Sequence, residues 1–368
     1  MPGVNLRGLR AHNRALLLGQ ILRAGGLSRI ELAERSRLTQ QAVSKIVPAL
    51  LDRGLLEERR QLASGVGKPR TLLRIRADAR YAIGAQLDRD EARVLMTDLL
   101  GRPVRAESQP LAAGFTPDHA VSVLAEATER LLDGVDRALV LGVGVGSVGP
   151  LDHRSGVVRD ATNLPGWHEV PLRAMLAERT GLPVLLDKDT NAAAVAQHWP
   201  GEPEADVAAT AVVLVGTGIG VGLFLDGRLY RGPRTNAGEF GHTTLAFDGP
   251  RCGCGRRGCV EVLHNNAAST AEAARLLGIG LVDLVQVLDL ERVVLTGPAV
   301  RAAPAVYRNG VEARLSELLP VPHWQRVRVE VSELGDDVVA LGAAAEVLGA
   351  FYEDPDRGLA DHGREARI

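Results

Sequence analysis

The sequence predicts an α/β protein that carries a small, mostly helical module at its N-terminus. The chain has 368 residues, a length typical of two or three domains, and its 46% hydrophobic and 24% charged residues are usual for globular proteins. Residues 1–76 hold 15 Lys and Arg against five Asp and Glu, whereas the remainder is acidic. From Tyr81 onward, strand-like segments alternate with amphipathic helical segments, which is the pattern of an α/β domain.

The basic N-terminal segment predicts three helices. Residues 13–24 have apolar side chains at helical spacing and end at two glycines that can close a helix. Ser28 and Glu31 have the spacing of a capping box, which starts a short second helix. Thr39 caps a third helix from Gln40 to about residue 52, and Pro48 is expected to kink it because proline removes a backbone hydrogen bond.

One further strand is predicted to begin at Leu55, and residues 71–75 would form a second strand antiparallel to it. The loop between these two strands is basic. This order predicts a winged helix-turn-helix over residues 1–76, with the third helix in the major groove of duplex DNA. The predicted DNA-contacting residues are Gln40, Gln41, Ser44 and Lys45 on that helix, and Lys68 and Arg70 in the wing. The alternative is a helical protein-interaction module with a solvated charged face.

Residues 81–352 predict the α/β body, and residues 353–368 a disordered tail. The uncharged stretch Val207–Leu225 has glycine at 216, 218, 220 and 222, which predicts two strands and a turn rather than a membrane span. Three cysteines are too few for a disulfide framework, and no secretory signal precedes the first helix. We therefore expect a cytoplasmic protein that does not enter the membrane.

All three cysteines lie within eight residues, and one histidine precedes them. Cys252, Cys254 and Cys259 on a glycine-rich knuckle, together with His242, supply the Cys₃His set that tetrahedral zinc prefers. Because four protein ligands leave no position open, the predicted Zn²⁺ is structural. The alternatives are a redox cluster or a chance grouping of cysteines.

Several segments carry a family resemblance. They are Asn163-Leu-Pro-Gly-Trp167, Asp187-Lys-Asp-Thr-Asn191, Gly238-Glu239-Phe240-Gly241-His242 and Cys252-x-Cys254-Gly-x-x-Gly-Cys259-x-Glu261. Together they resemble the signature of the ROK family of repressors, open reading frames and sugar kinases. With the winged helix-turn-helix in front, the match covers nearly the whole chain and is similar to the family's repressors. The resemblance implies a two-lobed, actin-like (ribonuclease H-like) ATPase fold with a sugar in the cleft.

The resemblance also implies a set of ligand-binding residues. Asp189 matches the carboxylate that serves the kinases as general base. Glu239, His242 and Glu261 match ligands of sugar hydroxyls, and His242 would use its second ring nitrogen for the sugar. The implied ligand-binding set is Asn163, Lys188, Asp189, Glu239, His242 and Glu261. Carboxylates can accept paired hydrogen bonds from neighbouring hydroxyls, which agrees with this assignment.

Three departures from the family pattern argue against a kinase. Residues 86–91 replace the glycines of the first ATP loop with three carboxylates, which would repel ATP, so ATP is not an expected cofactor. Lys188 stands where the family has an asparagine that binds sugar. It is expected either to pair with Asp187 or Asp189 or to admit a negatively charged ligand. Only 33 residues separate Glu261 from Leu295, fewer than the family has, so the second lobe is trimmed and does not predict the dimer surface that the resemblance places on it.

The leading hypothesis is a transcriptional regulator, acting as a repressor, that binds an operator in double-stranded DNA. A sugar or sugar-phosphate effector would bind in the cleft, and a homodimer or higher homo-oligomer would match a palindromic operator. The second hypothesis is an ATP-dependent, hexokinase-type sugar kinase with an attached DNA-binding module. A third is a regulator whose cleft is vestigial and which needs no effector.

Overall fold

The computed structural model describes residues 6–61, 70–161, 164, 166–200, 207–321 and 323–356. The N-terminal head consists of α1 (Leu6–Ala24), α2 (Arg29–Ser36), α3 (Gln40–Asp52) and the antiparallel pair β1 (Leu56–Gln61) and β2 (Arg70–Ile75). This confirms the predicted winged helix-turn-helix. Helix α1 begins seven residues earlier than expected, and α3 continues past Pro48 to Asp52.

The helix starts in the head follow the sequence signals. The Ser28 hydroxyl accepts from the backbone N–H of Glu31, and the Glu31 carboxylate accepts from the backbone N–H of Ser28, so the capping box is complete. Thr39 Oγ1 accepts from the backbone N–H of Ala42 at the start of α3. Both caps satisfy backbone donors that a helix cannot pair internally.

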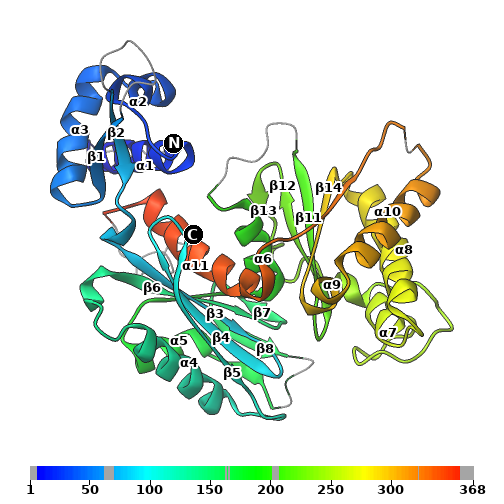
Figure 1. The fold of residues 1–368 in the computed structure, drawn as a ribbon. Helices are drawn as coiled ribbons and strands as arrows, with labels where there is room; N and C mark the ends of the chain where they lie inside the picture. The colour runs from blue at the N-terminus through cyan, green and yellow to red at the C-terminus, as the bar shows by residue number, and fades with distance from the viewer. Residues whose placement is uncertain are drawn as a thin grey trace.

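The first lobe of the body contains a five-stranded sheet of order β10-β6-β3-β4-β5. The strands are β3 (Tyr81–Leu87), β4 (Glu91–Asp98), β5 (Pro103–Pro110), β6 (Val140–Ser147) and β10 (Val184–Lys188). Helix α4 (Pro117–Leu131) covers one face, where it packs with α5 (Leu172–Thr180), and α11 (Val338–Glu353) covers the other (Figure 1). A smaller sheet is formed by β7 (Leu151–Asp152), β8 (Val157–Asp160) and β9 (His168–Val170).

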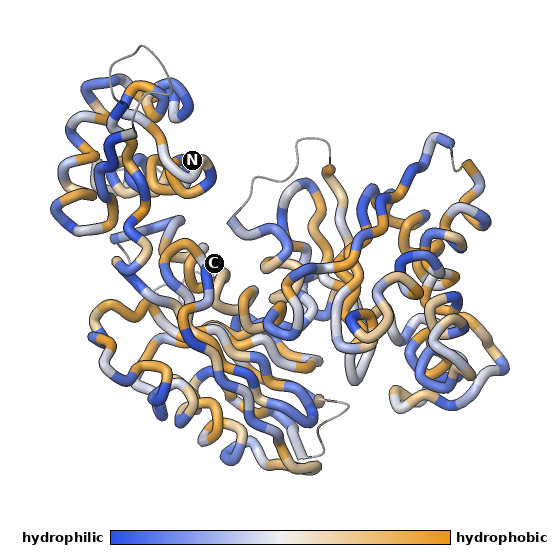
Figure 2. The backbone as a smooth tube through the Cα atoms, viewed as in Figure 1, coloured by the Kyte–Doolittle hydropathy of each residue, from blue (hydrophilic) through white to orange (hydrophobic). Residues whose placement is uncertain are grey.

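The second lobe contains another five-stranded sheet, of order β13-β12-β11-β14-β15. The strands are β11 (Ala209–Val215), β12 (Ile219–Leu225), β13 (Arg228–Leu229), β14 (Arg292–Thr296) and β15 (Arg328–Val331). The outer layer contains α7 (Val260–Asn265), α8 (Thr270–Leu288), α9 (Pro298–Ala302) and α10 (Pro304–Leu318). Strand β11 is buried along its whole length and is hydrophobic in Figure 2.

The segment Val207–Leu225 therefore forms two strands, as predicted, and not a membrane span. Strands β11 and β12 pair antiparallel across it, with Val215 opposite Ile219. Among the residues that the structure describes, no helix has the length and hydrophobicity needed to cross a membrane.

Helices α6 (Asp189–His198) and α11 form the layer between the two sheets. Helix α11 lies very close to β3 and β6 because Gly84 and Gly144 have no side chain. A Cβ atom at Gly84 would lie 1.9 Å from the carbonyl oxygen of Ala340, and one at Gly144 would lie 1.9 Å from that of Ala343. Since real Cβ atoms never approach so closely, glycine at these positions fixes α11 against the first lobe.

The head packs on the C-terminal end of α11 (Figure 1). Phe351 and Tyr352 share one buried apolar cluster with side chains of α1, including Leu18. Asp356 pairs with Arg14 of α1 at 2.8 Å and with Arg53, the C-cap of α3, at 2.6 Å. Residues 353–356, assigned by the sequence to a disordered tail, are thus placed against the head, and the rest of that tail lies outside the described residues.

Candidate functional site

The candidate nucleic-acid interface is the open face of α3. Gln40, Gln41, Ser44 and Lys45 are all exposed there. On the opposite side of the helix, Val43, Val47 and Leu50 are fully buried in the core of the head. The helical period thus brings the four predicted contact residues to one solvent-facing surface.

The wing is described only in part. Arg70 begins β2 with an exposed side chain and lies 3.4 Å from a carboxylate oxygen of Glu31, so it is placed beside α2. Lys68, the other wing residue predicted to contact DNA, lies outside the described residues.

The structure brings together the four predicted metal ligands. One donor atom from each of His242, Cys252, Cys254 and Cys259 lies within 4.8 Å of every other. Cys254 Sγ and Cys259 Sγ are 3.7 Å apart, and Cys252 Sγ is 3.6 Å from His242 Nδ1. Tetrahedral zinc with usual bond lengths separates two sulfurs by about 3.8 Å and a sulfur from a nitrogen by about 3.6 Å. The donor set therefore fits a tetrahedral metal ion.

The knuckle that carries the cysteines is closed by backbone contacts. The N–H of Cys252 donates to the carbonyl oxygen of Arg256 at 2.8 Å, and Thr244 bridges to Cys259. Gly258 has a φ of 58°, and a Cβ atom there would lie 1.6 Å from the carbonyl oxygen of Ala246. Glycine is thus required at this turn, which explains its presence in the motif.

A pocket lies between the lobes and contains most of the predicted ligand-binding residues. Together with the open solvent at its mouth it encloses about 740 Å³, and it lies where β3, β10 and α6 face the turn between β11 and β12. The polar lining residues are Gln86, Asp88, Lys188, Asp189, Thr190, Thr217, Glu239, His242 and Glu261. Asn163, also predicted to bind the ligand, lies outside the described residues.

Lys188 does not pair as the sequence suggested. Its ammonium group forms an ion pair with Glu239 and donates to the carbonyl oxygen of Ala237 at 3.0 Å, so it is bonded to neither Asp187 nor Asp189. The Lys188 side chain is 3% exposed, whereas that of Glu239 is 38% exposed. The ammonium group does not bond to Asp187 because the carboxylate of Asp187 is already bonded to Arg231 and Asn191. The ion pair therefore involves one of the predicted sugar ligands.

Asp189 is the first residue of α6 and faces the pocket. Burial, together with the carboxylate of Asp88 nearby, raises the pKa of Asp189 to about 7, and Lys188 opposes this shift. A carboxyl group with this pKa exchanges its proton near neutral pH, as a general base must. The side chain also accepts from the backbone N–H of Thr190 at 2.7 Å.

Glu261 and His242 reach the pocket from the second lobe. Glu261 Oε2 accepts from the backbone N–H of Ile219 at 2.9 Å, which fixes this carboxylate at the glycine-rich turn. His242 ends a 3₁₀ turn (Phe240–His242) and directs Nδ1 toward Cys252. Since its ring also lines the pocket, Nε2 is the nitrogen left for a ligand.

Two sets of polar contacts between the lobes could not be predicted from the sequence. The first lies at the mouth of the pocket, where Thr217 Oγ1 donates to Asp88 Oδ1 at 2.8 Å and the Arg89 guanidinium donates to the carbonyl oxygen of Thr217. In the second, Arg231 pairs with Asp187 and, at 2.9 Å, with Glu346 of α11. No motif marks Arg231, because its role depends on two carboxylates that are distant in sequence.

The fold and the pocket define a class of protein: a winged helix-turn-helix head joined to a two-lobed body of sugar-kinase type. Family models match in the same order, with the MarR family at residues 8–63 and the ROK family at residues 106–271. A hexokinase of the ROK family from Thermus thermophilus is 32% identical, with 72% of this chain and 97% of that chain covered and a TM-score of 0.59. The chain belongs to the ROK family.

Two of the relatives match nearly the full length of this chain, and a third matches about three quarters of it. A xylose repressor of Caldicellulosiruptor bescii is 25% identical over 95% of this chain and 98% of its own length. The DNA-binding transcriptional dual regulator NagC of Escherichia coli is 31% identical over 73% of this chain and 66% of its own. A ROK transcriptional regulator described as a homologue of the Escherichia coli MLC protein shares the fold, with a TM-score of 0.76, 20% identity and coverage of 96% and 98%.

Proposed function

We propose that this ROK-family chain is a sequence-specific DNA-binding transcriptional repressor whose cleft binds a sugar or sugar-phosphate effector. The observation that carries this proposal is the exposed polar face of α3, presented by a head that is joined to a ROK body. The xylose repressor that matches 95% of this chain and the transcriptional dual regulator NagC that matches 73% of it support the same assignment.

Contact with DNA would come from the face of α3 and from the wing. Gln40 and Gln41 can each form paired hydrogen bonds with adenine, and Ser44 and Lys45 can reach base edges or phosphates. Lys68 and Arg70 would contact the backbone beside the groove. A homodimer, or a higher homo-oligomer, would place two such heads about 34–36 Å apart, one turn of DNA, on a palindromic operator in the cytoplasm.

The effector would bind in the pocket between the lobes. Asp189, Glu239 and Glu261 are carboxylates that accept hydrogen bonds from sugar hydroxyls, and His242 Nε2 adds a further polar contact. Asn163 would belong to the same set by its motif. Because Lys188 holds Glu239, a ligand that uses Glu239 must share or replace this ion pair.

The Cys₃His cluster would hold a structural Zn²⁺ through His242, Cys252, Cys254 and Cys259. Bound zinc would fix the knuckle and the orientation of the His242 ring, and this chain's own residues would make every contact to the effector. The match between the donor distances and a tetrahedral ion supports this assignment.

We assign no catalytic activity to the cleft. The Thr217 hydroxyl and carbonyl, which belong to the turn that would face nucleotide phosphates, are already bonded to Asp88 and Arg89. The second candidate is an ATP-dependent sugar kinase, favoured by the near-neutral pKa of Asp189. Incubation with ATP, Mg²⁺ and a panel of hexoses decides between them: ADP release at the rate of a working kinase would establish the kinase.

DNA binding is tested with fragments selected by the purified chain from a random duplex library. Gln41→Ala is expected to lower affinity for the selected sequence by about 1–3 kcal/mol and to relax the base preference. Lys45→Ala is expected to weaken binding to selected and unselected sequences alike and to reduce the salt dependence. Arg308→Ala, which removes an exposed charge on α10, is the control. Failure to enrich any sequence, or equal affinity of all variants, would refute the proposal.

A further inference from the structure

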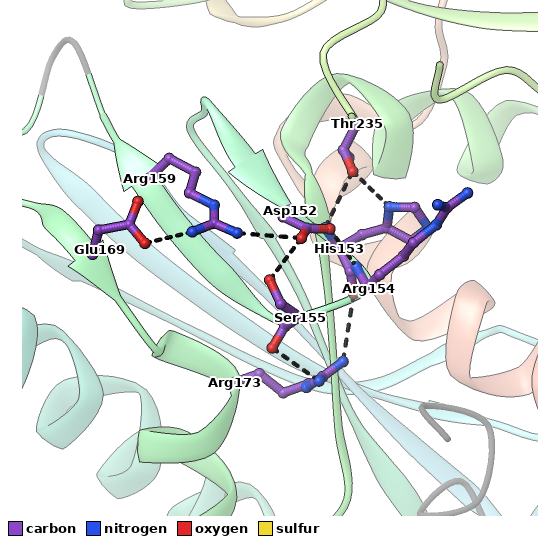
Figure 3. Close-up of polar contacts among 8 residues, drawn as sticks. All are labelled: Asp152, His153, Arg154, Ser155, Arg159, Glu169, Arg173 and Thr235. Carbon is purple, nitrogen blue, oxygen red and sulfur yellow. Dashed lines mark hydrogen bonds and ion pairs between the residues drawn. The ribbon is translucent and has the colours of Figure 1, made fainter. Parts of the chain in front are cut away.

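A second pocket lies beside the cleft and is lined by arginines from both lobes. It encloses about 750 Å³ of space open to solvent. The lining residues are Pro150, Leu151, Asp152, Arg154 and Arg159 from the first lobe, and Pro233, Arg234 and Asn236 from the second. Figure 3 shows the polar contacts among three of these residues, Asp152, Arg154 and Arg159, and their neighbours.

The turn that presents Arg154 is held in one conformation. Asp152 accepts from the Ser155 hydroxyl at 2.8 Å and from the backbone N–H of Arg154 at 3.0 Å. The Arg173 guanidinium donates to the carbonyl oxygens of His153 and Ser155, at 3.4 and 2.9 Å (Figure 3). Each of these contacts orders the backbone of the turn without using the guanidinium of Arg154, which is exposed.

The facing loop of the second lobe is fixed to this turn. Thr235 is 1% exposed, and its hydroxyl contacts both the backbone N–H of His153 at 3.2 Å and His153 Nδ1 at 2.6 Å. The neighbouring Arg234 is exposed on the same loop. The contact between Thr235 and His153 thus fixes the backbone from which Arg154 and Arg234 extend before any ligand binds, which lowers the entropic cost of ordering these loops.

The charges of the pocket do not cancel. Arg159 forms an ion pair with Glu169 and lies 3.5 Å from Asp152, so its charge is balanced (Figure 3). Asp152 is in turn neutralised by that arginine and by its hydrogen bonds. Neither Arg154 nor Arg234 has a carboxylate partner within the described ranges. Two guanidinium groups therefore remain to bind an anion, which arginine does with paired hydrogen bonds.

The second pocket adjoins the cleft along two segments of chain. Gly149 lines the cleft and the next residue, Pro150, lines the second pocket. On the other side, Asn236 lines the second pocket, and Ala237 accepts the hydrogen bond from Lys188 of the cleft. The linings of the two pockets are therefore contiguous along the chain on both sides.

The two pockets differ in the charge they favour. The cleft contains the carboxyl groups of Asp88, Asp189, Glu239 and Glu261, and Lys188 is its one cationic residue among those that the structure describes. An anionic group placed in the cleft would be repelled, whereas neutral hydroxyls would find acceptors. If a ligand places its hydroxyls in the cleft and also carries an anionic group, that group is better accommodated beside Arg154 and Arg234.

We propose that the pocket formed by Arg154, Arg159 and Arg234 is an anion subsite, which binds the carboxylate or phosphate group of an acidic saccharide whose hydroxyls lie in the cleft. This inference rests on the proposed function and names its effector class. Uronic acids and sugar phosphates share the required chemistry, and the experiment separates them.

The test is calorimetric titration of the full chain with glucuronate, galacturonate, hexose phosphates and the neutral parent hexoses. At least one acidic saccharide is expected to bind about tenfold or more tightly than its neutral parent, because each charge-assisted hydrogen bond stabilises the complex. The double variant Arg154→Gln/Arg234→Gln is expected to lose this advantage while its affinity for neutral sugars changes less than about twofold. Arg179→Gln/Arg308→Gln removes two exposed arginines elsewhere and is the matched control.

The outcomes separate this inference from the proposed function. Tight binding of uronic acids alone identifies a carboxylate ligand, and tight binding of sugar phosphates alone identifies a phosphate ligand. If neutral hexoses bind as tightly as acidic ones, or if the double variant behaves as the control does, the anion subsite is refuted and the sugar-responsive repressor stands. If no saccharide binds while sequence-specific DNA binding persists, both the subsite and the effector are refuted, but the regulator is not.

Discussion

Replacing Asp189 with asparagine should stabilise the protein, and by an amount that depends on pH. Burial in the cleft and the neighbouring Asp88 raise the pKa of Asp189 from 3.8 to about 7. The folded state therefore holds this proton more tightly than the unfolded state does. The resulting stabilisation is fully present below pH 3.8 and is lost as the pH rises through 7. Asparagine has a similar shape but never carries the charge.

The size of the effect follows from the pKa shift. A rise from 3.8 to about 7 corresponds to about 4 kcal/mol if the full shift is realised. Asp189 is partly exposed to the open cleft, so solvent reduces the cost of its charge, and we expect about 2 kcal/mol. Asp189→Asn should thus exceed the wild type in stability by about 2 kcal/mol at pH 8, and by much less at pH 5.

Urea unfolding followed by tryptophan fluorescence between pH 5 and 8 measures this difference. Asp133→Asn, which removes an exposed carboxylate after α4, is the control and should show no change across the range. If the stability difference between Asp189→Asn and the wild type is the same at pH 5 as at pH 8, the raised pKa is wrong. A less stable asparagine variant at pH 8 would show that the carboxylate is stabilised by its neighbours.

Three further predictions concern other parts of the molecule. Arg231→Met leaves Asp187 and Glu346 buried without a cation and should lower the unfolding free energy by about 3–5 kcal/mol at pH 8. Because burial and Asp187 raise the pKa of Glu346, protonation should reduce this loss at pH 5, which urea unfolding would detect. Cys254→Ser should lower the bound zinc measured by atomic absorption and the melting temperature together, and a chelator should leave this variant's melting temperature nearly unchanged. Asp356→Asn should speed hydrogen exchange in α1 and α3, measured by mass spectrometry, without changing exchange in the second lobe.

Much of the fold could be predicted because its signals are local. The caps at Ser28 and Thr39, the alternating glycines of β12 and the cysteine spacing of the knuckle each depend on a few neighbouring residues. The start of α1 was predicted seven residues too late because segment 6–12 has only Leu6 and Leu9 at helical spacing, too short a pattern to mark a helix. Helix α3 nevertheless runs through Pro48 to Asp52, although proline there removes one backbone hydrogen bond.

The contacts of the site were harder to predict because they join distant segments. The sequence indicated that Lys188 would choose between its neighbours Asp187 and Asp189, yet it pairs with Glu239, 51 residues away. Asp187 is unavailable since Arg231 and Asn191 already bond to its carboxylate. Only the folded arrangement of the two lobes shows which of several carboxylates a given cation reaches.

Helix α11 connects the cleft to the DNA-binding head through one contact near its middle and another just past its C-terminus. Glu346 forms an ion pair with Arg231 of the second lobe. Ten residues further along the chain, Asp356 forms an ion pair with Arg53 at the end of the recognition helix α3. Because Gly84 lets the helix backbone pack directly on β3, α11 cannot shift without disturbing its contact with the first lobe. A ligand that changes the separation of the lobes must therefore either strain the ion pair between Arg231 and Glu346 or carry α11 with it. In the second case the position of α3 changes with the state of the cleft, which is the coupling that a regulated repressor requires.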